Sequence, residues 1–111
     1  MEAEFLSWLR GQLPSHPRLR LGIGDDAAIL ELAPDARCVV TSDMLNDGVD
    51  FVWDRCDGRL VGRKSLAVNL SDLAAMAAQP LAAVVSLTLP RRSALAVGQQ
   101  FYQGLLPLAA E

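Results

Sequence analysis

RLVGRKSLAVNLSDLAAMAA, residues 59–78, is the stretch that decides the fold, because it is the longest helical pattern in the chain. Its second half, residues 73–78, consists of small or apolar side chains, so this helix can pack closely against a sheet. Gln79 and Pro80 follow, and a proline just beyond a helical pattern is a stop signal. The sequence therefore predicts one long helix with a carboxylate, Asp72, in its interior.

Shorter elements surround this helix. An amphipathic helix is predicted over residues 2–13, ended by Gly11 or by Pro14, and a final helix follows Ser93 and is kinked or ended by Pro107. Apolar and β-branched runs predict three strands, and the rest is a polar connection and a loop that contains a short strand. The strands are residues 27–32, 37–43 and 81–89, the connection is 15–20 and the loop is 46–58. This order favours an α+β fold, with helices on one face of a small, largely antiparallel sheet that leaves an edge or a face open.

Composition bounds what the protein can be. With 111 residues, about half of them apolar, the chain fits a single domain over residues 1–111. The net charge of −3 leaves no surplus of cations for a phosphate backbone, which argues against nucleic acid as a partner. Glu2 and Glu4 stand where a secretory signal carries positive charge, and no apolar stretch is long enough to span a bilayer. We expect a cytoplasmic protein whose Cys38 and Cys56 are reduced thiols.

Three motifs carry the oxygen ligands that magnesium takes, in a chain with nine Asp and only four Glu. Residues 22–26, Gly-Ile-Gly-Asp-Asp, place two carboxylates before a strand, and neighbouring side chains there point to opposite faces, so only one can face a site. Residues 41–43, Thr-Ser-Asp, add two hydroxyls and a carboxylate at a strand end. Asp72 must be paired or metal-bound if it is buried. The alternatives are a solvated turn, a strand-terminating turn and, for Asp72, a helix cap after a break at Ser71.

Other kinds of chemistry find little support in the sequence. Gly48 does not centre an EF-hand, since Leu45 takes one ligand position and Asp54 the place of the bidentate glutamate. A Gly-Lys-Ser/Thr phosphate loop is absent, and His16, the only histidine, lies in a polar connection, so no catalytic residue is assigned. Lys64, the only lysine, either meets a phosphate or belongs to a solvated basic turn.

Three blocks of the chain resemble the thiamine-monophosphate kinase family in order and spacing. They are Gly24-Asp25-Asp26, Thr41-Ser42-Asp43-Met44-Leu45 with Gly48-Val49 and Phe51, and residues 64–76. The resemblance runs from about Phe5 to the last residue. It implies the N-terminal domain of the aminoimidazole ribonucleotide synthetase-like superfamily, an α+β domain that dimerises through its sheet and binds ATP and magnesium near the subunit junction.

Carried over residue by residue, the resemblance makes Asp26, Thr41, Ser42, Asp43 and Asp72 magnesium ligands, with the ions shared by the phosphates of ATP. The implied reaction moves the γ-phosphoryl of ATP to thiamine monophosphate and gives thiamine diphosphate. Such a transfer needs mainly positioning and charge neutralisation. The implied partners are thus ATP, thiamine monophosphate and a second copy of the chain.

Two departures from the family pattern matter. Asp50 stands where the family commonly has a histidine that touches the substrate, and its carboxylate is expected to attract the cationic thiazolium or the pyrimidine by charge. The next nucleotide-binding motif of the family, a Gly-Gly-Asp, is expected just beyond Glu111. The chain is therefore expected to be an N-terminal fragment that cannot turn over ATP alone.

Two other functions stay open. Another ATP-dependent reaction of the same superfamily keeps the fold, although the block Asn69-Leu70-Ser71-Asp72 speaks against it. A non-catalytic dimerisation or metal-binding module is the second. A screen of thiamine monophosphate against other acceptors distinguishes the first alternative from the kinase. Titration with Mg-ATP distinguishes the second, because a module built only for assembly should show no binding that depends on Asp72.

Overall fold

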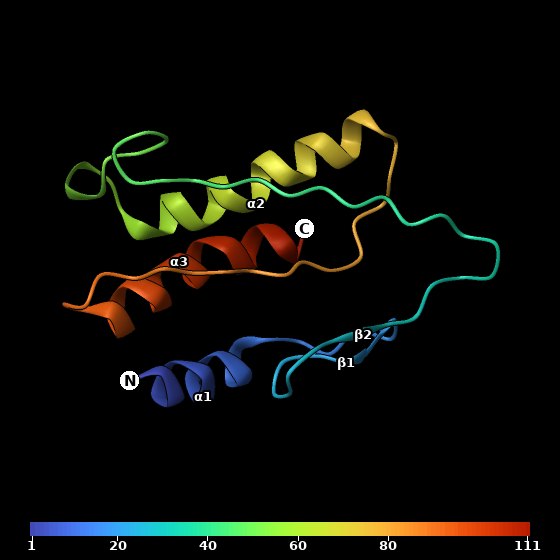
Figure 1. Ribbon diagram of the computed structural model, residues 1–111, viewed down its shortest axis with the longest axis horizontal. Coiled ribbons are helices and arrows are strands. Elements are labelled where there is room, and N and C mark those ends of the chain that lie inside the picture. Colours follow the sequence, from blue (N-terminus) through green and yellow to red (C-terminus); the bar gives the residue numbers. More distant parts are fainter.

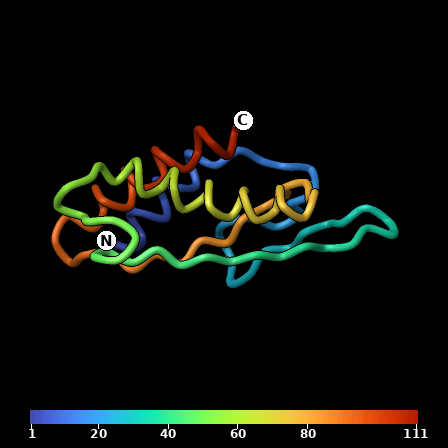
Figure 2. The backbone as a smooth tube through the Cα atoms, turned by 90° about the horizontal axis from the view of Figure 1, so that it is seen from above, coloured from blue at the N-terminus to red at the C-terminus, as the bar shows by residue number.

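The computed structural model describes residues 1–111 and contains three α-helices, a short 3-10 helix and a two-stranded sheet. The elements are α1 Glu2–Gln12, β1 Leu19–Leu21, β2 Ile29–Leu30, η1 Trp53–Arg55, α2 Gly58–Ala75 and α3 Ala94–Ala109. Figures 1 and 2 show the helices in one layer, with two long extended segments along one side of it. The α+β class is therefore confirmed, but the helices pack on one another and not on a face of the sheet, since the main contacts between elements are α2 with α3, α1 with α3 and β1 with β2.

The sheet is antiparallel, as predicted, but it is much smaller than predicted. β2 lies within the predicted strand 27–32, whereas most of β1 lies in residues 15–20, which were predicted to be a polar connection. β1 has the sequence Leu-Arg-Leu and pairs with β2 across an irregular register. A strand of three residues is too short for its alternation to stand out in a polar background, and this explains the error.

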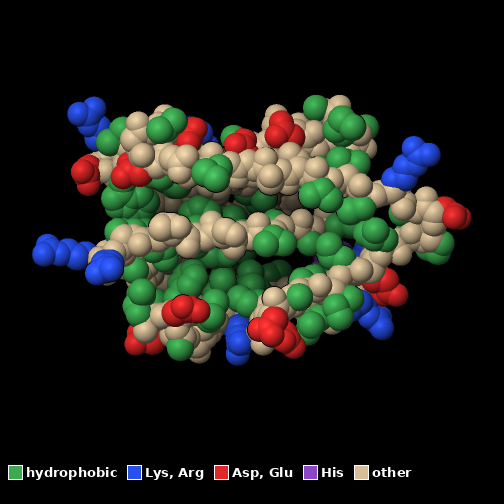
Figure 3. Space-filling model, viewed as in Figure 1, with side chains coloured by type: hydrophobic (Ala, Val, Ile, Leu, Met, Phe, Trp, Pro, Cys, Tyr) green, Lys and Arg blue, Asp and Glu red, His purple; other side chains and the backbone are tan.

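Two further predicted strands, residues 37–43 and 81–89, are extended but pair with nothing, so both predictions are wrong for the single chain. Apolar and β-branched side chains suit a strand, yet its backbone N–H and C=O groups also need a neighbour. Each segment keeps apolar side chains exposed: Val40 is 83% exposed and Val84 is 94% exposed, whereas Val85 and Leu87 of the second segment pack against the core. Figure 3 shows hydrophobic side chains spread over this face of the molecule.

The long helix lies close to its predicted limits. α2 begins after Asp57, whose carboxylate accepts a hydrogen bond from the backbone N–H of Arg59 at 2.9 Å. It ends at Ala75, before the predicted limit of residue 78, because Ala77 takes a left-handed conformation with φ 53°. Asp72 therefore lies inside a continuous helix.

The other two helices also form, with differences at their ends. α1 runs to Gln12, so Gly11 does not end it. α3 follows Ser93 as predicted, but the Ser93 side chain makes no capping hydrogen bond. Pro107 does not end α3, which continues to Ala109. A proline this near the C-terminus of a helix removes a single hydrogen bond, so the helix tolerates it.

The core lies where the three helices meet. Tyr102 packs against Phe5 of α1 and Phe101 of α3, with ring centroids 5.9 and 5.5 Å away. Burial raises the pKa of the Tyr102 phenol above its ordinary value of 10.0. The buried cluster comprises Leu9, Val61, Phe101, Tyr102 and Leu105. None of the three helices combines the length and the apolarity that a membrane crossing needs.

Two glycines allow α2 and α3 to touch through their backbones. A Cβ atom on Gly62 would overlap the backbone carbonyl of Phe101, and one on Gly104 would overlap the backbone carbonyl of Arg59. The contact is reciprocal, since each helix contributes one glycine to it. This crossing holds α2, and with it Asp72, in a fixed place relative to the core.

Candidate metal centre

The structure brings together two of the five predicted ligands, Thr41 and Asp72. The Thr41 hydroxyl donates a hydrogen bond to Asp72 Oδ2 over 3.4 Å, although 31 residues separate them. Asp72 is exposed, so water solvates its charge and no burial cost forces it to be paired. The helix-cap alternative for Asp72 is wrong, because α2 is unbroken at Ser71 and is capped by Asp57.

The Gly-Asp-Asp motif forms a turn that separates the roles of its two carboxylates. Gly24 has φ 124°, a conformation that side chains rarely allow, and the guanidinium of Arg10 lies against it. Asp25 Oδ1 accepts a hydrogen bond from the backbone N–H of Asp26 at 2.8 Å. Asp25 thus stabilises the turn, while the exposed carboxylate of Asp26 has no partner in the chain. That only one of the pair serves a site stays a prediction, since these residues form a turn and not the extended segment on which it was based.

The Thr-Ser-Asp motif, residues 41–43, lies in the extended segment that leads to the loop at residues 46–58. Asp43 Oδ1 accepts a hydrogen bond from the backbone N–H of Met44 at 2.8 Å, but residues 41–46 form no turn, so the alternative of a strand-terminating turn is wrong. Its second oxygen and the exposed hydroxyl of Ser42 make no hydrogen bond. Within this motif, the hydrogen bonds of Thr41 and Asp43 thus leave the Ser42 hydroxyl and the second Asp43 oxygen free.

The carboxylates do not form a closed cage, since no group of three or more His, Cys, Asp or Glu side chains is clustered closely enough to hold a metal ion. The donors nevertheless suit magnesium, because it keeps several waters and takes one or two carboxylates together with substrate phosphates. A further oxygen lies one turn before Asp72 on α2: Asn69 donates from its amide nitrogen to the Ser65 carbonyl at 2.8 Å, and its buried Oδ1 has no partner. The residues present thus fit a magnesium–phosphate group.

Asp50 lies in a tight turn over residues 46–50. Its Oδ2 accepts a hydrogen bond from the backbone N–H of Asn46 at 2.7 Å, so half of the carboxylate is committed to the turn. Its backbone carbonyl accepts a hydrogen bond from Lys64 Nζ at 2.7 Å. Sequence reasoning considered Lys64 for a phosphate or a solvated turn and missed this contact, because no local pattern links residues 50 and 64.

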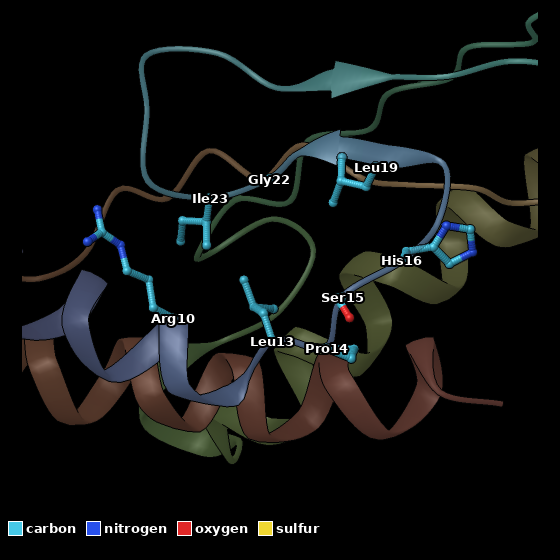
Figure 4. Close-up of a pocket in the computed structure, with 8 residues that line it drawn as sticks. All are labelled: Arg10, Leu13, Pro14, Ser15, His16, Leu19, Gly22 and Ile23. Carbon is cyan, nitrogen blue, oxygen red and sulfur yellow. The ribbon is translucent and has the colours of Figure 1, made fainter.

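A separate cavity of about 240 Å³ lies beside the C-terminal end of α1. Figure 4 shows Arg10 and His16 at its two ends, with side chains that point away from each other. His16 Nδ1 accepts a hydrogen bond from the backbone N–H of Arg18 at 3.2 Å. None of the predicted ligands lines this cavity, whose walls are Arg10, Leu13, Pro14, Ser15, His16, Leu19, Gly22 and Ile23.

Comparison with known proteins identifies a family and several relatives that are similar to this chain. Residues 24–111 match the family described as AIR synthase related protein, N-terminal domain. A thiamine-monophosphate kinase of Rhodopirellula baltica is 40% identical, over 98% of this chain and 37% of its own length. A thiamine-monophosphate kinase of Synechococcus elongatus is 44% identical over 74% of this chain and 25% of its own length. One from Bacillus subtilis is 34% identical over 85% of this chain and 29% of its own length.

The chain thus spans about a third of the length of these relatives. No solved structure matches it significantly. The match over residues 24–111 includes the Gly-Asp-Asp turn, the Thr41–Asp72 pair and the helix that carries Asp72. The chain therefore belongs to the AIR synthase related family, of which it carries the N-terminal domain.

Proposed function

We propose that this chain is the ATP- and magnesium-binding N-terminal domain of a thiamine-monophosphate kinase. The observation that carries the proposal is the 40% identity to a thiamine-monophosphate kinase over 98% of the chain. The activity moves the γ-phosphoryl group of ATP to thiamine monophosphate and gives thiamine diphosphate. Residues 1–111 match only 37% of the length of that relative, so we propose that they carry part of the site and are inactive alone.

The ligands proposed for magnesium are Asp26, Thr41, Ser42, Asp43 and Asp72. When bound with ATP, magnesium neutralises charge on the phosphates during transfer. Asp25 and the α2–α3 crossing hold Asp26 and Asp72 in place, so these groups need little reorganisation. The free Oδ1 of Asn69 supports the proposal, because a buried oxygen acceptor without a partner is costly unless a donor or a cation reaches it.

Asp50 is proposed to bind thiamine monophosphate. One carboxylate oxygen holds the turn, which leaves the other to attract the positive charge of the thiazolium. A charge that is fixed on a closed turn loses little conformational freedom on binding. The substrate side of the site thus lies at the start of α2, and the metal side lies further along the helix.

A second copy of the chain is the proposed partner for the extended segments. Residues 37–43 and 81–89 have the backbone of strands, expose apolar side chains such as Val40 and Val84, and lack a neighbour. Pairing between two copies supplies the missing hydrogen bonds and buries those side chains. We place the homodimer in the cytoplasm, where ATP is available and where Cys38 and Cys56 remain free thiols.

The test is formation of thiamine diphosphate by the protein as the cell makes it, with Mg-ATP and a panel of phosphorylated acceptors. The proposal expects thiamine monophosphate to be the preferred acceptor, with no turnover when magnesium is chelated. Preference for another acceptor favours a different ATP-dependent reaction of the superfamily. Binding of Mg-ATP without turnover on any acceptor favours a non-catalytic module.

A further inference from the structure

We infer that Lys64 is a positioning residue, which holds the turn at residues 46–50 at a fixed place along α2. Its Nζ donates to the backbone carbonyl of Asp50 at 2.7 Å, across 14 residues of sequence. The consequence for catalysis rests on the proposed function, since it concerns thiamine monophosphate as the acceptor. The contact itself is independent of that assignment.

The turn that Lys64 holds is closed by its own hydrogen bonds. The Asn46 carbonyl accepts from the N–H groups of Val49 and Asp50 at 3.1 and 2.9 Å, and Asp50 Oδ2 accepts from Asn46 N–H at 2.7 Å. The N–H of Gly48, whose φ is 84°, donates to the Phe51 carbonyl at 2.7 Å. The turn is therefore a small rigid unit that fixes the Asp50 carboxylate with respect to the Asp50 carbonyl.

Residues just after the turn rest on the core. Phe51 and Trp53 pack against the buried cluster. Their rings meet edge to face, with the ring centroids 6.3 Å apart. Asp47 Oδ1 accepts a hydrogen bond from Trp53 N–H at 2.8 Å. Lys64 supplies the only hydrogen bond between residues 46–50 and any part of the chain beyond residue 53. Removing its ammonium group thus removes the one hydrogen bond between the turn and α2, while Phe51 and Trp53 stay packed on the core.

Two contacts fix the path of the chain between the metal and substrate ends of the site. Thr41 is hydrogen-bonded to Asp72, and the Asp50 carbonyl is hydrogen-bonded to Lys64. Residues 41–50 therefore run antiparallel to α2, as Figure 1 shows. Eight helical residues span about 12 Å. Nine residues of extended chain would span about 30 Å, so the turn takes up the excess. Lys64 thus fixes the Asp50 end of this path on α2, next to the packing of Phe51 and Trp53 on the core.

The partner of Lys64 is a neutral carbonyl, so the contact requires a donor rather than a charge. A phosphate contact would instead require the charge. Lys64→Met removes both the donor and the charge, whereas Lys64→Gln removes the charge and keeps a donor. Arg91→Met is the matched control, since Arg91 is an exposed cation without a hydrogen bond in the structure.

The first experiment is amide hydrogen exchange of residues 1–111 in these variants. Loss of one hydrogen bond is expected to speed exchange at the Val49 and Asp50 amides about 2- to 10-fold in Lys64→Met, with part of the protection restored in Lys64→Gln. Exchange in Arg91→Met is expected to match that of the wild type. Unchanged exchange of both amides in Lys64→Met overturns the inference.

The second experiment is steady-state kinetics of the protein as the cell makes it. Lys64→Met is expected to raise KM for thiamine monophosphate about 3- to 10-fold, with KM for ATP unchanged and partial recovery in Lys64→Gln. A raised KM for ATP with an unchanged KM for the acceptor overturns the inference in favour of a phosphate contact. A wild-type protein without activity on thiamine monophosphate overturns the proposed function instead, and the exchange experiment still decides the role of Lys64.

Discussion

The hydroxyl of Thr41 and a carboxylate oxygen of Asp72 lie 3.4 Å apart, although one belongs to an unpaired extended segment and the other to the last turn of α2. The hydrogen bond is long and Asp72 is exposed, so it contributes little to stability. Its significance is geometric, since it places two of the proposed oxygen ligands, from distant parts of the chain, at one point.

Thr41→Val tests this pairing, because valine keeps the shape of threonine and removes the hydroxyl. We expect the free energy of unfolding to change by less than about 1 kcal/mol, whereas affinity for Mg-ATP falls about 10-fold. Urea unfolding and calorimetric titration measure the two quantities. A large loss of stability with unchanged affinity would show that Thr41 is a packing residue instead.

The backbone contact between α2 and α3 predicts a large effect of a single methyl group. Gly62→Ala and Gly104→Ala should each destabilise the fold by about 3 kcal/mol or more, because the new Cβ overlaps a backbone carbonyl that cannot move aside. Gly11→Ala is the control: nothing lies near its Cβ position, and alanine favours a helix by up to about 1 kcal/mol. Equal unfolding midpoints in all three variants would contradict the crossing.

Tyr102 predicts how stability depends on alkaline pH. Burial raises the pKa of its phenol above 10.0 in the folded state, so the neutral form is favoured by folding. The contribution is fully present below pH 10 and is lost as pH rises through the raised pKa, at up to about 1.4 kcal/mol per pH unit. Urea unfolding from pH 8 to about pH 11 should show a steeper loss in the wild type than in Tyr102→Phe. Parallel curves for the two proteins would contradict this assignment.

The proposed dimer predicts that Val84→Lys separates the copies without unfolding them. Val84 is 94% exposed, so the lysine disturbs no contact inside one chain and stability should change by about 0.5 kcal/mol or less. Its charge would be costly between two paired chains. Sedimentation should show a dimer for the wild type and for the exposed-site control Gln79→Lys, and a monomer for Val84→Lys. A wild-type chain that sediments as a monomer argues against this interface.

Local patterns predicted the helices well, because helices satisfy their own backbone hydrogen bonds within the pattern. The long helix and its aspartate follow directly from residues 59–78, but the helix ends at Ala75, before the predicted stop at Pro80. The strands were predicted less well, since the runs at 37–43 and 81–89 have the composition of strands but find no neighbour within the chain. Composition reports the preference of a segment, whereas a sheet depends on what lies beside it.

The sequence predicted which residues make up the candidate site, but it did not predict how they are arranged in space. Carboxylate chemistry and family resemblance pointed to Asp72 and Thr41, but only the fold shows that they meet. Alternation along an extended segment predicted that only one of Asp25 and Asp26 faces a site. The structure instead has a turn at Gly24, where Asp25 accepts a hydrogen bond from the N–H of Asp26. Lys64 was missed as a contact of Asp50, because that contact is set by the path of the whole loop.

The central claim is that Asp72 and its companions hold magnesium for transfer of a phosphoryl group from ATP to thiamine monophosphate. The most direct measurement is the rate of thiamine diphosphate formation at saturating magnesium by the protein as the cell makes it, compared with its Asp72→Asn variant. We predict a loss of at least about 100-fold in the variant, with an unchanged unfolding midpoint because the side chain is exposed. Equal rates in the two proteins would contradict the account.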